Sequence, residues 1–230
     1  MLTSVARAAP LLTALLLASG PVLAQGTVLD QGVLSIMRGT AEVGREEFTI
    51  RLGRPATGQP DGFTISGTAT YSTERPQRVV VTVAELGPDS QMTLVTQEYR
   101  NGGTRKAAVG IGARRLTIRT QTPDGESARE HPRTGAVLVI DHSAFAHLAL
   151  LGTMTPGPVT VVSPFEGERQ TAQLTDHGND RIRVKGVERA LRHLSLGTGD
   201  NALHAWYDDR GHLVQVSIPA RDIRAVREPS

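Results

Sequence analysis

Asp141, His142 and Ser143 are the three residue types of an acyl-transfer triad, and they are consecutive in the sequence. In a working triad the nucleophile, the base and the orienting acid converge from different backbone positions, which adjacent residues cannot do. We therefore expect Asp141 to cap a following helix. A hydrolase that uses His142, His204 or Asp208 is the least favoured function, because it requires two of these side chains to meet within hydrogen-bonding distance.

The histidines suggest metal ligands at two places, and each has a simpler explanation. His142 and His147 lie about 140° apart around a helix, so they are not expected to share one metal ion. The segment 176–180 reads Asp-His-Gly-Asn-Asp. It contains possible ligands, but its Gly and Asn are typical of a hairpin tip. The chain has no cysteine, which excludes disulfides and thiolate chemistry. We predict no metal and no cofactor.

His204, Trp206 and Asp208 alternate along one face of an expected strand. Trp206 is the only tryptophan, and a lone tryptophan is found more often in a core than in a ligand platform. This segment therefore has a structural interpretation and a binding interpretation, and the sequence leaves both open.

The motifs of common enzymes are absent from the sequence. It contains no Gly-x-Ser-x-Gly, phosphate loop, three-glycine dinucleotide fingerprint or His-Glu-x-x-His. The pairs Glu46-Glu47 and Glu166/Glu168 supply carboxylates, but no pattern places one opposite another. We predict that the protein is not an enzyme.

Composition narrows the class of protein. The 230 residues are 39% hydrophobic and 21% charged, which is ordinary globular usage. Basic and acidic residues nearly balance, at 25 and 23, and aromatic residues are only 3%. Charge therefore gives no reason to expect nucleic acid, and the few aromatics argue against single-strand stacking surfaces and membrane-barrel girdles.

Residues 1–24 have the pattern of a cleaved bacterial signal peptide. Arg7 precedes an apolar stretch at 11–18, and Val22 and Ala24 occupy the positions before the expected cleavage point. The apolar stretch is too short to span a bilayer comfortably, and no later segment is long enough. We expect one β-rich domain over 25–230, periplasmic or secreted, that does not span a membrane.

The remaining chain alternates apolar and polar residues with a period of two, which predicts half-buried strands. Turn signals such as Asn101-Gly102-Gly103 separate these segments. The pattern predicts thirteen to fifteen strands in an antiparallel sheet. The expected strands cover 33–37, 47–52, 63–71, 78–86, 92–99, 106–111, 115–122, 136–140, 159–162, 171–175, 181–187, 192–196, 202–207, 213–218 and 223–226.

One segment breaks the alternation and predicts a short helix over His142–Leu151. Asp141 suits its N-cap, and Gly152 suits a left-handed C-cap. A helix of this length is not stable alone in water, so packing must hold it. It is apolar nearly all round, which favours a position on the concave side of a curved sheet.

This layout resembles the half-barrel carrier superfamily, which includes periplasmic lipoprotein carriers. The segments Arg38–Phe48 and Trp206–Val214 are also similar to the first and last hairpins of uncharacterised exported bacterial proteins. The resemblance implies a strongly curved antiparallel sheet, or open half-barrel, around an apolar slot. The carriers bring several helices to their cavity, whereas this sequence predicts one.

The function we expect is binding of a lipophilic ligand, such as an acyl chain, in a carrier or chaperone role in the cell envelope. The alternative is a structural or envelope-assembly protein with a fully packed core, because the same alternation serves a cavity or a core. The protein partner is not indicated by the sequence. The predicted ligand-lining residues are Phe145, Leu148, Leu151, Met154 and Trp206.

Overall fold

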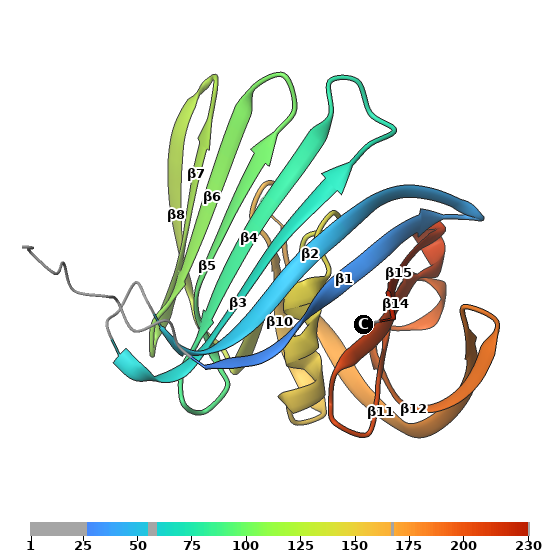
Figure 1. The fold of residues 1–230 in the computed structure, drawn as a ribbon. Helices are drawn as coiled ribbons and strands as arrows, with labels where there is room; N and C mark the ends of the chain where they lie inside the picture. Colours follow the sequence, from blue (N-terminus) through green and yellow to red (C-terminus); the bar gives the residue numbers. More distant parts are fainter. Residues whose placement is uncertain (1–26, 55–58, 167, 230) are drawn as a thin grey trace, which may run out of the picture.

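The computed structural model describes residues 27–54, 59–166 and 168–229, so the expected signal peptide at 1–24 lies outside the described residues. These residues form one open sheet of fifteen strands in the order β8-β7-β6-β5-β4-β3-β2-β1-β15-β14-β13-β12-β11-β10-β9 (Figure 1). The mostly β, antiparallel prediction is therefore confirmed. Within the described residues, no helix has the length and apolarity needed to cross a bilayer.

The strands follow one another as a long meander. Their bounds are β1 Val28–Arg38, β2 Ala41–Arg54, β3 Gln59–Tyr71, β4 Arg78–Leu86, β5 Met92–Arg100, β6 Thr104–Ile111, β7 Arg115–Thr122, β8 Gly125–Pro132, β9 Ala136–Val139, β10 Gly157–Ser163, β11 Glu168–Val184, β12 Val187–Leu196, β13 Leu203–Tyr207, β14 Leu213–Ile218 and β15 Ile223–Arg227. Three 3-10 helices join them: η1 Ala146–Thr153, η2 Gly199–Asn201 and η3 Pro219–Arg221.

The sheet is bent so that its two edges approach each other. β1 pairs with β15, so the sheet runs from there to β8 in one direction and to β9 in the other. Fifteen strands laid flat would put the two edges about 65 Å apart. Only residues 133–135 join β8 to β9, and three residues span roughly 14 Å at most. Strong curvature of the sheet follows, and Figure 1 shows its two halves on either side of η1.

The edges meet near this short connection. Nη1 of Arg169, on β11, donates to the carbonyl of Pro132 at 3.2 Å, and Oγ1 of Thr160, on β10, donates to the carbonyl of Thr134 at 3.1 Å. β9 runs parallel to β10, whereas the other strand pairs of the described residues are antiparallel. The chain therefore crosses from one edge of the sheet to the other and then enters η1.

The helical segment differs from its prediction. An α-helix was expected over His142–Leu151, but the structure has an eight-residue 3-10 helix, Ala146–Thr153. Its residues contact β3 and β4 in one half of the sheet and β13 and β14 in the other. Tyr207 donates a hydrogen bond of 2.7 Å to the carbonyl of Leu148. A side chain of the sheet thus forms a hydrogen bond with a backbone carbonyl of η1. This carbonyl does not need a partner from a regular α-helix, which helps to explain the 3-10 form.

Gly152 is not the left-handed C-cap that we predicted. It lies inside η1, and its φ is not positive. A Cβ at this position would lie 3.0 Å from the Tyr207 ring. The glycine is therefore required by the close approach of η1 to β13.

The segment 176–180 is also different from its prediction. We expected a hairpin tip between two strands, but β11 is one continuous strand, Glu168–Val184. Its pairing with β12 shifts between Asp176 and Asn179, which is a β-bulge. Gly178 has a φ of 73°, so the positive φ that the sequence predicts for a turn occurs in a bulge instead.

The interior holds two apolar clusters. The main core lies on the face of the sheet that packs against η1, and it includes Phe145, Leu148 and Leu151. A smaller cluster includes Trp206 and Leu191. Both clusters depend on the alternation of the strands, which puts one row of side chains on each face.

Candidate functional site

A buried carboxylate lies at the start of η1. Glu46, on β2, is fully buried and accepts backbone hydrogen bonds from Phe145 at 2.6 Å and Ala146 at 3.1 Å. Burial raises the pKa of Glu46 to about 7, although the two backbone donors act in the opposite direction. A Cβ at Gly67, on β3, would lie 2.5 Å from Oε1 of Glu46, so the facing strand has a glycine there.

Asp141 organises the turn before η1 and does not cap the helix itself. Oδ1 of Asp141 accepts a hydrogen bond of 2.7 Å from the backbone N–H of Ser143, and Oδ2 accepts one from the hydroxyl of Tyr99. The predicted N-cap role is therefore wrong, because η1 begins later and Glu46 takes up its first N–H groups. Burial raises the pKa of Asp141 to about 6, despite the hydrogen bonds from Ser143.

Arg78 holds the same turn from β4. Its guanidinium lies 3.9 Å from the centre of the Tyr71 ring, and Nη1 donates to Oγ of Ser143 at 3.3 Å. Nη2 lies 2.8 Å from Glu74, while Nε is buried and has no hydrogen-bond partner. Tyr71 donates to the carbonyl of Ser143 at 2.9 Å. An unpartnered buried N–H is costly, and within the described residues Nε of Arg78 has no compensating acceptor.

Arg78, Asp141 and Ser143 line a pocket of about 290 Å³, which we call the arginine pocket. Its walls come from five stretches of the chain: 78, 99–105, 140–143, 163–166 and 221. The lining residues are Arg78, Tyr99, Arg105, Ile140, Asp141, His142, Ser143, Ser163, Pro164, Phe165, Glu166 and Arg221.

Three arginines line the arginine pocket, together with the two carboxyl groups of Asp141 and Glu166. Within the described part of the chain, neither Arg105 nor Arg221 forms an ion pair. Arg105 lies over the rings of Tyr99 and Phe165, at 5.3 and 5.2 Å. His142 is neutral near pH 7, because burial and then Arg221 lower its pKa. The chemistry of the pocket therefore suits an anion.

A second hollow of about 610 Å³, the adjoining groove, continues from the arginine pocket. The two share Ile140, His142, Ser163, Glu166 and Arg221. The rest of the groove is lined by a mixture of apolar and amide or hydroxyl side chains. These residues are Val161, Gln170, Thr171, Ala172, Gln173, Leu196, Gly197, Thr198, Asn201, Leu203, Ile218 and Ala220.

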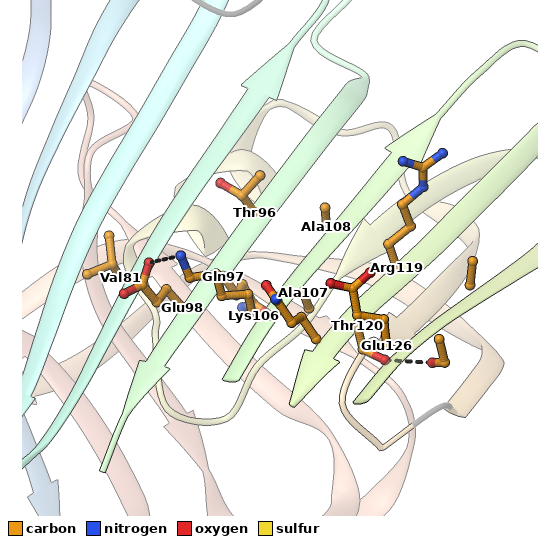
Figure 2. A pocket seen from close by; sticks show the side chains of 13 residues that line it. Val81, Thr96, Gln97, Glu98, Lys106, Ala107, Ala108, Arg119, Thr120 and Glu126 are labelled. Carbon is orange, nitrogen blue, oxygen red and sulfur yellow. Dashed lines mark hydrogen bonds and ion pairs between the residues drawn. The ribbon is translucent and has the colours of Figure 1, made fainter. Parts of the chain in front are cut away.

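A separate hollow of about 640 Å³ lies on strands β4–β8, and Figure 2 shows the side chains that line it. Its lining includes Ala108 and Thr96. Glu98 lies 3.5 Å from Lys106, and Thr120 and Ser127 share a hydrogen bond of 2.7 Å. These two pairs account for only part of the lining, because Gln97 is buried and neither atom of its amide has a hydrogen-bond partner among the described residues.

The five predicted lining residues lie elsewhere. Phe145, Leu148, Leu151 and Met154 pack in the main core, and Trp206 packs in the smaller cluster. None of the five lines the arginine pocket, the adjoining groove or the hollow of Figure 2. The structure therefore does not bring them together at one surface.

The histidines and Asp208 that we considered for hydrolysis do not meet. In the described residues, no hydrogen bond or ion pair joins any two of His142, His204 and Asp208. Asp208 instead accepts backbone hydrogen bonds within its own hairpin, from Arg210 and His212. No group of three or more acidic or histidine side chains in the described chain could hold a metal ion as arranged.

Sequence reasoning missed the residues of the arginine pocket. Arg78, Arg105 and Arg221 carry no local signal, because each lies near the start of a strand or in a short connection, where an arginine is ordinary. Glu46 did carry one. It is in phase with Phe48 and Ile50 on the apolar face of its strand, and a carboxylate at such a position needs a buried partner.

No family model matches this chain, and comparisons with curated proteins and with solved structures find no match either. The resemblance to half-barrel carriers therefore stays a prediction.

Proposed function

We propose that this protein is an exported, non-enzymatic binding protein of the bacterial cell envelope. It is a half-barrel with η1 on its concave side, and its ligand is an amphipathic molecule with an anionic head and an acyl-like chain. The observation that carries the proposal is the continuity of the arginine pocket with the larger, partly apolar groove. The two hollows share five lining residues.

The arginine pocket supplies the site for the anionic head. Arg105 and Arg221 lie on its exposed rim, and Arg78 lies deeper with its Nε unpartnered. Guanidinium groups bind carboxylates and phosphates through paired N–H donors. Burial raises the pKa of Asp141 to about 6, so this carboxyl group is still mostly ionised near pH 7 and opposes an anion least below pH 6.

The adjoining groove supplies the site for the chain. Leu196, Leu203 and Ile218 provide apolar surface, and its volume of about 610 Å³ falls in the range of small-molecule sites. A ligand seated here leaves the core beneath η1 closed. Phe145, Leu148 and Leu151 then stay in the core and do not contact the ligand. They would contact it only if η1 moved.

Two features of the sequence support export and carriage. The signal-peptide pattern of residues 1–24 directs the chain to the periplasm or beyond. The curved sheet with one covering helix is the arrangement that the resemblance to lipoprotein carriers implies.

Calorimetric titration with palmitate tests this proposal. Wild type should bind one palmitate, and the double substitution Arg105→Gln/Arg221→Gln should weaken binding by roughly a hundredfold, because two charge-assisted contacts are lost. Arg119→Gln, in the hollow of Figure 2, is the matched control and should bind as wild type does. Equal affinity in the double variant and the control would refute the site.

A structural or envelope-assembly role is the second candidate. The dense packing of Phe145 and Leu151, both 0% exposed, favours it, because the helix face predicted to line a slot is filled by the protein itself. This candidate predicts that palmitate does not bind at all. β8 would then be the edge available to a partner, since most of its residues are exposed.

A further inference from the structure

Three histidines and the only tryptophan gather on β11, β12 and β13, outside the two hollows proposed for ligand. His177 comes from the bulge of β11, His193 from β12, and His204 and Trp206 from β13. The His193 ring is stacked between His177 at 4.5 Å and Trp206 at 4.6 Å. None of these residues has a role in the proposed function, so we call them the histidine cluster and consider them separately.

We propose that His193 and His204 bind one divalent transition-metal ion of tetragonal preference, with Cu²⁺ as the best fit. Nε2 of His193 and Nδ1 of His204 lie 2.9 Å apart and share a hydrogen bond, which the metal ion would replace. Two adjacent ligands at 2.0–2.1 Å from a metal and at right angles are about 2.9 Å apart. The spacing of the two nitrogens thus matches neighbouring positions of a square-planar or tetragonal site. For the ion to bind, the proton of this hydrogen bond moves to Nε2 of His204, and the rings turn so that both lone pairs point at the ion.

The surroundings of His193 suit metal binding at its Nε2 atom. Binding at Nε2 of His193 leaves its proton on Nδ1, which lies 3.6 Å from the carboxylate of Asp180. A carboxylate that faces the non-ligating nitrogen fixes the tautomer, as is common for histidine ligands.

His177 is not a third ligand in this arrangement. Its Nε2 is held by Oγ of Ser195 at 2.8 Å. This agrees with the absence, among the described residues, of a group of three side chains placed to hold a metal. Water fills the remaining positions of the ion, and a two-histidine site of this kind binds Cu²⁺ in preference to Zn²⁺, in line with the Irving–Williams order.

Tryptophan fluorescence can report metal binding, because Trp206 is the only tryptophan and its ring is stacked on His193. The exported chain, purified without a polyhistidine tag, is titrated with Cu²⁺ at pH 7.5 and its fluorescence is followed. Wild type should lose most of its tryptophan emission at one equivalent, and electron paramagnetic resonance should show nitrogen ligands. His193→Gln and His204→Gln should each weaken quenching at least about tenfold.

His177→Gln and His131→Gln, the latter on β8, are the matched controls and should be quenched like wild type. Unchanged quenching in folded His193→Gln and His204→Gln, judged by circular dichroism, would overturn the proposal. Should one of these two variants fail to fold, the other decides alone. The result is independent of the ligand proposal, because Arg105→Gln/Arg221→Gln should bind Cu²⁺ as wild type does.

Discussion

The backbone N–H of Phe145 donates a hydrogen bond of 2.6 Å to the carboxylate of Glu46, 99 positions earlier in the chain. The other carboxylate oxygen accepts from Ala146. A helix of eight residues is not stable alone, and its first N–H groups need acceptors. Glu46 therefore joins β2 to η1 and fixes the end of the turn that lines the arginine pocket.

Replacement of Glu46 by leucine should lower the free energy of unfolding by about 3 kcal/mol, because two buried N–H groups lose their acceptor. Urea denaturation measures this change. Glu47→Leu is the matched control, because Glu47 is exposed on the other face of β2, and it should change stability by less than about 0.5 kcal/mol. A similar loss in both variants would contradict the role of Glu46.

The stability of the wild type should fall with rising pH relative to Glu46→Gln. The pKa of Glu46 is raised from 4.5 to about 7 by folding, so the folded state holds this proton more tightly than the unfolded state. The contribution is complete below pH 4.5 and is lost as the pH rises to 7, by on the order of 3 kcal/mol. Urea denaturation from pH 4.5 to 8 measures it, and parallel curves for the two proteins would be the opposite result.

Gly67→Ala should destabilise the protein by about 1–3 kcal/mol, because the new methyl group would lie 2.5 Å from the Glu46 carboxylate. Gly110→Ala is a matched control on β6, where a Cβ meets nothing within 4 Å. Thermal denaturation compares the two. Equal melting temperatures would show that the contact between β3 and the Glu46 carboxylate is not tight.

Ala172→Phe should reduce the affinity for palmitate but not for a short carboxylate such as butyrate. Ala172 lines the adjoining groove and is absent from the arginine pocket, so the larger ring obstructs the chain and leaves the head site open. Ala108→Phe, in the hollow of Figure 2, is the control. Calorimetry with both acids measures the effect. Loss of butyrate binding in Ala172→Phe would mean that the two hollows are not separate subsites.

The strands were predictable because their alternation is a local property. The segments 78–86 and 115–122 coincide with β4 and β7 for this reason. The helix was not predictable in detail, since its 3-10 form and its start depend on Glu46 and Tyr207, which come from distant strands. The bulge at Asp176 was read as a turn because both conformations use the same glycine and asparagine chemistry.

The candidate site was less predictable than the fold. Its three arginines come from β4, β6 and η3, and only the curvature of the sheet brings these elements to one pocket. The residues predicted to line a ligand slot are buried in the two apolar clusters. Period-two patterning alone cannot distinguish a cavity wall from a packed interior.

Native mass spectrometry of the chain purified from a periplasm without detergent tests the central claim most directly. The account predicts a population carrying one anionic amphiphile, which organic extraction identifies, and uptake of one palmitate by the remainder. The Arg105→Gln/Arg221→Gln variant should lose this adduct. A clean unliganded mass in the wild type, with no uptake of added palmitate, would contradict the account and leave the structural role.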